Sequence, residues 1–185
     1  MKDSKIIIGF TLLIFVFVVF SSCATTKFSK EPDESITTLL VGQIRLETYG
    51  IPIGYELKGP YTSPIQIYLE NMSTGEIAKL ESKGSEGFFS MINPSAKSYR
   101  IQKIYLKAFG ENYYAEFEFI ISSEVILNIN EGKVNNLGLI EWKYDYNYKR
   151  QYADNLNYEK TKIWFEEKYP ESVWNKKEWV NIILW

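Results

Sequence analysis

Residues able to do acid–base or nucleophilic chemistry are scarce in this sequence. It contains no histidine and a single cysteine, Cys23. Without histidine there is no Ser-His-Asp or Cys-His arrangement, and with one cysteine there is no internal disulfide. Structural zinc and haem sites are excluded on the same grounds. Catalysis would therefore have to depend on carboxylates.

The carboxylate pair that best fits an enzyme is Glu116 and Glu118, two positions apart on one predicted strand. A rise of about 3.4 Å per residue separates their Cα atoms by roughly 7 Å, within the range of about 5–9.5 Å seen for glycosidase pairs. Their predicted cross-strand neighbours are Lys107 and Tyr105. A solvated, charge-paired sheet face therefore explains both glutamates. We predict no enzymatic activity.

Oxygen ligands that could bind calcium occur near the end of the predicted β region. They are Glu141, Asp145, Asn147 and Asp154. Their spacing matches no calcium-binding loop, so solvated polar side chains are the simpler interpretation. We predict no metal and no cofactor other than a covalent lipid.

Aromatic residues crowd the C-terminal segment, which is the most unusual feature of the chain. One interpretation is that these rings form a joint core with a sheet. The other is that some of them contact a glycan or a protein partner, a role that suits rings with satisfied edges. The candidate contact residues are Tyr144, Tyr146, Tyr148, Trp164, Trp174 and Trp179.

Cys23 follows an N-terminal pattern of its own. Lys2 and Lys5 precede an apolar run at 6–20, which is shorter than the roughly 20 residues that span a bilayer, and Ser21-Ser22 come directly before the cysteine. This segment resembles the lipobox signal peptide of bacterial lipoproteins. The resemblance implies diacylglycerol on Cys23, cleavage after residue 22 and acylation of the new N-terminus. An ordinary secretory signal that leaves a free thiol, or an uncleaved amphipathic anchor, are the alternatives.

The charge balance excludes a basic nucleic-acid-binding protein. The chain has 185 residues and a net charge of −2, and losing two lysines and one aspartate with the signal leaves −3. An aromatic content of 16% excludes a disordered chain. The lipid on Cys23 would be the contact with the bilayer. In some bacteria, an Asp directly after the cysteine retains a lipoprotein at the inner membrane. This chain has Ala24 at that position, which by this analogy favours the outer membrane.

Between residues 39 and 144 the sequence predicts short strands separated by Gly, Pro, Asn and Ser. The predicted strands are 39–47, 65–70, 77–81, 87–92, 98–109, 113–121, 125–130 and 136–144. Short strands with turn signals about every 8–12 residues favour an antiparallel β-sandwich of about 7–8 strands. We therefore predict a mainly β fold with a C-terminal helical, aromatic-rich appendix.

One hairpin is predicted to the residue. A turn centred on Glu111-Asn112 pairs Leu106 with Phe117 on an apolar face and Lys107 with Glu116 on a charged face. Upstream, the alternation of apolar residues changes phase, which predicts a β-bulge near residues 102–103.

After residue 144 the pattern becomes helical. Asn157 is a predicted N-cap for a helix over 158–168. Ser172 could cap a second, short helix that runs through Trp179. The last residues, 180–185, are predicted to form a strand or a packed tail. We divide the chain into a signal peptide at 1–22, the lipidated cysteine with a flexible tether at 23–36, a β-sandwich domain at 37–148, and a C-terminal helix and tail packed on the sandwich at 149–185.

The stretch 43–142 resembles the transthyretin-like and carboxypeptidase-regulatory-like β-sandwich modules of bacterial lipoproteins. The segments that carry the resemblance are 65–75, 87–92, 98–104 and 129–140. The enzymatic branch of that family uses histidines and a C-terminal Tyr-Arg-Gly-Ser motif, and this chain has neither. The resemblance implies a non-enzymatic structural or binding module on a cell-envelope lipoprotein. The alternatives are a glycan- or host-ligand-binding surface adhesin, or an assembly subunit that docks another envelope protein.

Overall fold

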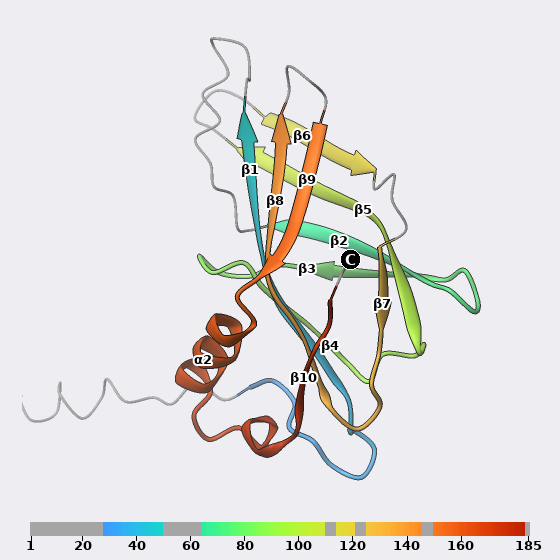
Figure 1. The fold of residues 1–185 in the computed structure, drawn as a ribbon, viewed down its shortest axis with the longest axis vertical. Helices are drawn as coiled ribbons and strands as arrows, with labels where there is room; N and C mark the ends of the chain where they lie inside the picture. The colour runs from blue at the N-terminus through green and yellow to red at the C-terminus, as the bar shows by residue number, and fades with distance from the viewer. Residues whose placement is uncertain (1–27, 50–63, 110–113, 121–124, 146–149, 184–185) are drawn as a thin grey trace, which may run out of the picture.

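The structure is a computed structural model that describes residues 28–49, 64–109, 114–120, 125–145 and 150–183. The fold is mainly β, as predicted, with a single α-helix among these residues near the C-terminus (Figure 1). The elements are β1 Leu39–Tyr49, β2 Ile65–Asn71, β3 Ile77–Glu81, β4 Phe88–Ile92, β5 Ser98–Phe109, β6 Tyr114–Ile120, β7 Ile126–Asn128, β8 Val134–Asp145, β9 Arg150–Leu156, α2 Tyr158–Lys168, the 3-10 helix η1 Val173–Lys176, and β10 Trp179–Asn181.

The strands form two sheets, as expected for a sandwich. The first sheet has the order β10-β8-β1-β4 with β9 also paired to β8, and the second has the order β3-β2-β5-β6 with β7 paired to β5. Most pairings are antiparallel, but β1 and β10 both run parallel to β8, which the sequence did not predict. Parallel neighbours need a long crossover. Here the second sheet lies within the connection from β1 to β8, and β9, α2 and η1 lie within the connection from β8 to β10.

The predicted hairpin register of β5 and β6 is confirmed. Leu106 pairs with Phe117, and Lys107 pairs with Glu116. Leu106 is fully buried, whereas Glu116 is exposed to solvent. The side chains of Phe117 and Lys107 lie outside the described part of the chain.

The predicted β-bulge is also confirmed, at Gln102. In the pairing of β2 with β5, Tyr68 lies opposite Lys103 and the next residue, Leu69, lies opposite Ile101. Gln102 is therefore the extra residue, and its side chain is exposed. The bulge lets Ile101 and Ile104 both point into the core although they are three positions apart.

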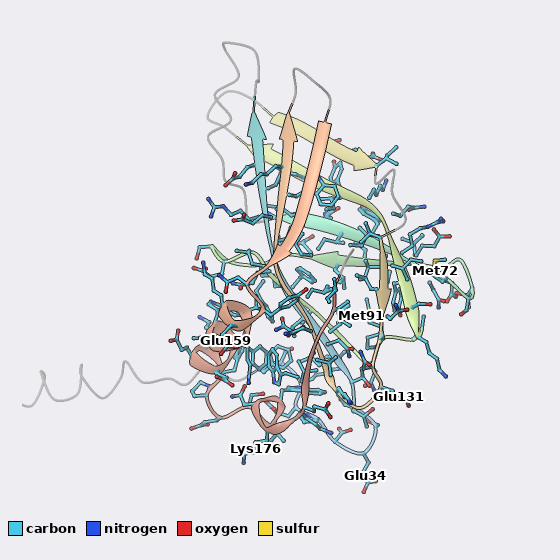
Figure 2. All side chains as sticks on the ribbon, viewed as in Figure 1. Glu34, Met72, Met91, Glu131, Glu159 and Lys176 are labelled. Atoms are coloured by element: carbon cyan, nitrogen blue, oxygen red, sulfur yellow. The ribbon has the colours of Figure 1, made fainter. Side chains whose placement is uncertain are left out.

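Strand β1 is buried on both faces because the molecule has three layers. Leu40, Ile44 and Leu46 face the core between the two sheets. Leu39 and Val41 point the other way, into a second cluster with Phe165 and Trp174. Helix α2 and η1 cover this outer face of the first sheet (Figure 1), and Figure 2 shows side chains packed between them and the strands.

The C-terminal segment is part of the first sheet as well as a layer upon it. The predicted helix is confirmed as α2, and the Asn157 side chain accepts a hydrogen bond from the Lys160 N–H at 3.3 Å. Ser172 caps η1, as predicted. The short helix was predicted to run through Trp179, but it ends at Lys176, because Trp179 is the first residue of β10. The strand β9 had no counterpart in the prediction. It pairs along β8 from Leu139 to Asp145.

Residues 28–36 differ from the expected flexible tether, because they pack against the C-terminal layer. Phe28 is only 7% exposed, with its ring centroid 5.2 Å from that of Phe165. The backbone carbonyl of Lys30 accepts a 2.8 Å hydrogen bond from Trp174 Nε1. Glu31 accepts hydrogen bonds from the Ser172 hydroxyl and the following backbone N–H. In the sequence, four residues, 24–27, separate Cys23 from Phe28.

Candidate functional site

Of the candidate contact residues, the structure describes the side chains of the three tryptophans only. Cys23, Tyr146 and Tyr148 lie outside the described residues, and Tyr144 lies in β8 opposite Gln151 of β9. The three tryptophans belong to one cluster, with Phe28, Phe88 and Phe165, but they differ in how far they are buried.

Trp174 is a core residue and not a contact residue. It is fully buried, and its indole N–H is satisfied by the Lys30 carbonyl. Trp179 is half-buried in β10, and its Nε1 donates to the Trp174 carbonyl at 3.1 Å. Trp164, by contrast, lines a pocket.

Glu116 and Glu118 are exposed, in keeping with a charged sheet face. Glu118 Oε1 lies 3.0 Å from Lys103 Nζ, which also lies 4.8 Å from the centre of the Tyr68 ring. The partner of Glu118 is thus a diagonal lysine. An ion pair of this kind is solvated and contributes little to stability.

The residues considered for calcium binding are held by ordinary strand pairing. Glu141 lies opposite Asp154 in the β8–β9 pair, and its carboxylate is 3.9 Å from Lys143 Nζ. Asn147 lies outside the described residues. Within the described ranges, no three acidic, cysteine or histidine side chains come together as a metal site. In the same ranges, no helix combines the length and the apolar character needed to cross a bilayer.

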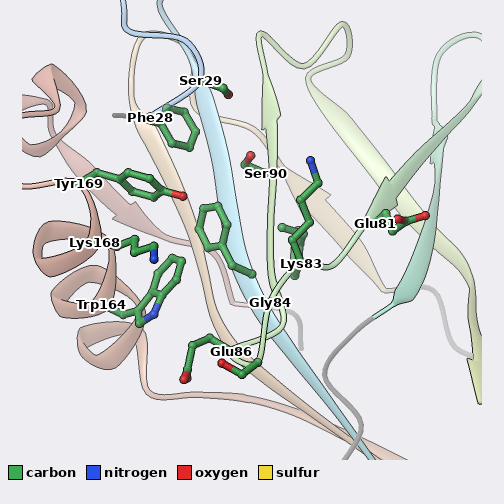
Figure 3. A pocket seen from close by; sticks show the side chains of 13 residues that line it. Phe28, Ser29, Glu81, Lys83, Gly84, Glu86, Ser90, Trp164, Lys168 and Tyr169 are labelled. Carbon is green, nitrogen blue, oxygen red and sulfur yellow. The ribbon is translucent and has the colours of Figure 1, made fainter. Parts of the chain in front are cut away.

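A pocket of about 520 Å³ lies between α2 and the turn at residues 83–87 (Figure 3). Trp164 and Lys168 come from α2, and Tyr169 follows directly after the helix. Phe88 comes from β4, and Phe28 closes the pocket from the N-terminal segment. The pocket therefore collects side chains from three separate parts of the chain.

One wall of the pocket is aromatic and interlocked. The rings of Phe88 and Trp164 are 4.6 Å apart between centroids, and those of Trp164 and Tyr169 are 6.1 Å apart at 89°. Phe28 meets Tyr169 edge-on at 5.1 Å. Tilted and edge-to-face contacts of this kind are favourable and fix the ring orientations. Burial raises the pKa of the Tyr169 hydroxyl above its usual value of about 10.

The opposite side of the pocket is polar. Its charged residues are Lys83, Glu81 and Glu86, and serine hydroxyls accompany them. A fourth charged residue, Lys168, lies on α2 between Trp164 and Tyr169 (Figure 3). Among the described residues, neither lysine forms an ion pair with a carboxylate. The pocket can thus stack on an apolar face and hydrogen-bond to polar groups.

The turn that carries the polar side is held by its own backbone. Lys83 and Phe88 exchange two backbone hydrogen bonds, at 2.7 and 3.1 Å. Between them, Gly84 and Gly87 have φ of 68° and 65°, a left-handed conformation that glycine adopts at little cost. The tight turn sets Lys83 and Glu86 across from α2.

Two buried polar residues join the walls of the pocket. Thr161 Oγ1 donates to Gln43 Oε1 at 2.8 Å, which ties α2 to β1. Gln43 Nε2 donates to the Glu86 carbonyl at 3.4 Å, which ties β1 to the turn. Sequence reasoning missed both residues, because a threonine in a helix and a glutamine in a strand carry no signal of contact across 118 positions.

No protein-family model, curated protein or solved structure matches this chain. The resemblance to transthyretin-like modules therefore stays a prediction.

Proposed function

We propose that this protein is an exported, lipid-anchored lipoprotein of the cell envelope that serves as a non-enzymatic binding module. The observation that carries the proposal is Cys23, the only cysteine, directly after the apolar run and Ser21-Ser22. Two or three acyl chains, at about 0.8 kcal/mol per buried CH₂, would hold the protein at a membrane durably. Ala24 favours the outer membrane.

The packing of the N-terminal segment supports a body held close to the bilayer. Phe28 is the first described residue, and it is buried against α2. An extended chain advances at most about 3.3–3.6 Å per residue, so Phe28 would lie within roughly 18 Å of the lipidated residue. The pocket that Phe28 helps to line would then open near the membrane surface.

The binding role is supported by the pocket between α2 and the 83–87 turn, which combines an aromatic wall with polar groups. This combination favours the adhesin alternative, in which a glycan or host ligand is bound. An assembly subunit that docks another envelope protein through its C-terminal aromatics has less support. Trp174 is fully buried, and Trp179 is half-buried.

The anchor is tested with Cys23→Ser in cells fed a palmitate analogue that can be detected chemically. We expect the variant to lose the label and to leave the membrane fraction or accumulate unprocessed. Ser29→Ala, an exposed change outside the lipobox, is the matched control and should label normally. Label that persists on Cys23→Ser would show that the lipoprotein assignment is wrong.

A further inference from the structure

We propose that the pocket between α2 and the 83–87 turn binds a neutral saccharide, with a sugar ring stacked on the aromatic wall at Trp164. The inference rests on the binding role proposed above but not on the lipid anchor. At about 520 Å³ the pocket is within the range of small-molecule sites, about 300–1,000 Å³. It has room for one end of an oligosaccharide.

The aromatic wall matches the apolar face of a sugar ring. The C–H groups of a pyranose form such a face, and an indole ring offers the flat surface it needs. Trp164 is half-buried, and its ring lies 4.6 Å from that of Phe88 and 6.1 Å from that of Tyr169 between centroids. Because its neighbours fix the ring, stacking would cost little side-chain entropy.

The polar side matches the hydroxyl groups of a sugar. A hydroxyl both donates and accepts hydrogen bonds, so a saccharide needs donors and acceptors together. The Lys83 and Lys168 ammonium groups can donate, and the Glu86 carboxylate can accept (Figure 3). The Glu81 carboxylate lies farther from α2 and accepts a 3.3 Å hydrogen bond from Gln66 Nε2. The neutral Tyr169 hydroxyl can do both.

The charge balance of the lining distinguishes a neutral saccharide from other ligands. For an acidic ligand, the carboxylates of the lining would offset part of the attraction of the two lysines. A wholly apolar ligand would strip water from four charged groups without replacing the lost hydrogen bonds, which is costly. A polyol satisfies the charged groups and still covers the rings.

The buried link through Gln43 keeps the two sides of the pocket at a set separation. Gln43 holds α2 through the Thr161 hydroxyl and holds the turn through the Glu86 carbonyl. A pocket organised before binding pays less for ordering its side chains. This favours a site used for recognition over a chance surface groove.

The test uses the purified full chain in a detergent without a sugar headgroup. The probes are cellohexaose, laminarihexaose, maltohexaose and chitohexaose, followed by tryptophan fluorescence and calorimetry. We expect at least one probe to bind and Trp164→Ala to weaken that binding at least tenfold. Ile163→Ala, which changes the neighbouring exposed residue of α2, should bind as the unchanged protein does.

A second variant keeps the test decisive if Trp164→Ala unfolds. Lys83→Ala changes an exposed turn residue, so it should keep the melting temperature and still weaken binding severalfold. Lys79→Ala, an exposed lysine of β3 outside the pocket, is its control. The proposal is overturned if no probe binds, if Lys83→Ala binds unchanged, or if hexagalacturonate binds in preference. None of these results affects the labelling of Cys23, so the two proposals fail separately.

Discussion

At the scale of single residues, a few buried polar groups determine how the layers fit together. Gln43 and Thr161 are both buried, and each would carry an unsatisfied polar group without the other. Their 2.8 Å hydrogen bond therefore fixes α2 on β1 at one position and orientation. An apolar contact alone would specify that position less sharply.

Thr161→Val tests this contact, because it keeps the shape of the side chain and removes the donor. It leaves Gln43 Oε1 buried without that donor, so we expect a loss of about 1–3 kcal/mol in the free energy of unfolding. Thr161→Ser keeps the hydroxyl and serves as the control in the same denaturant titration. Equal stability of the valine variant and the unchanged protein would contradict the role given to this hydrogen bond.

Tyr169 predicts a stability change at alkaline pH. Burial raises its pKa above the usual value of about 10, so above that pH the unfolded chain loses this proton more readily than the folded one. The contribution of Tyr169 to the free energy of unfolding is therefore complete below about pH 10, and it declines as the pH rises through the raised pKa. Tyr169→Phe should flatten the fall of the melting temperature between about pH 9 and 11. Parallel curves for the two proteins would refute this assignment.

At the scale of elements, the β5–β6 hairpin shows how two faces agree on one register. Leu106 points into the core and is fully buried, while Glu116, on the opposite face, is exposed. A slip by one residue would exchange the two faces along the whole strand. The same alternation that made the pairing predictable therefore also stabilises it.

The two faces of this hairpin predict unequal costs of truncation. Leu106→Ala opens a cavity between the sheets and should cost about 2–5 kcal/mol. Glu116→Ala removes a solvated group from the outer face and should cost under about 1 kcal/mol. Chemical denaturation of both variants checks the difference. Similar losses would mean that the faces are assigned wrongly.

At the scale of the whole molecule, the C-terminal segment completes the fold. It adds β9 and β10 to one edge of the first sheet, and it adds α2 and η1 as a third layer. Phe165 and Trp174, both fully buried, pack on Leu39 and Val134 of the sheet and on Phe28 of the N-terminal segment. The two ends of the described chain thus depend on one another.

Deletion of 153–185 should therefore damage the whole protein. It uncovers the outer face of the first sheet, including Leu39, Val41 and Phe88, and an apolar patch of that kind promotes aggregation. We expect the truncated chain to aggregate or to melt at a much lower temperature. Ile163→Ala in the full chain is a control that should melt normally, since this side chain is 44% exposed. An unchanged melting temperature after the deletion would instead favour a docking surface.

Local pattern determined much of the fold. Alternation of apolar and polar residues sufficed for the eight strands from β1 to β8, the hairpin register and the bulge at Gln102, because each depends on neighbours in sequence or on a short turn. Capping residues predicted the start of α2 for the same reason. The predicted lipidation signal that ends at Cys23 is likewise a local pattern, and it stays a prediction.

Tertiary structure alone decided what depends on contacts between distant segments. Three such contacts join segments far apart in sequence. They are the parallel pairing of β1 with β8, the parallel pairing of β10 with β8, and the burial of Phe28 against the C-terminal layer. The strand β9 is a different case, because it pairs with β8, which comes directly before it in the sequence. Of the three tryptophans proposed as contacts, whose side chains the structure describes, only Trp164 lines the pocket. Its position on α2 relative to the 83–87 turn depends on how the third layer packs. The pocket could not be predicted, since its sides meet only when the layers assemble.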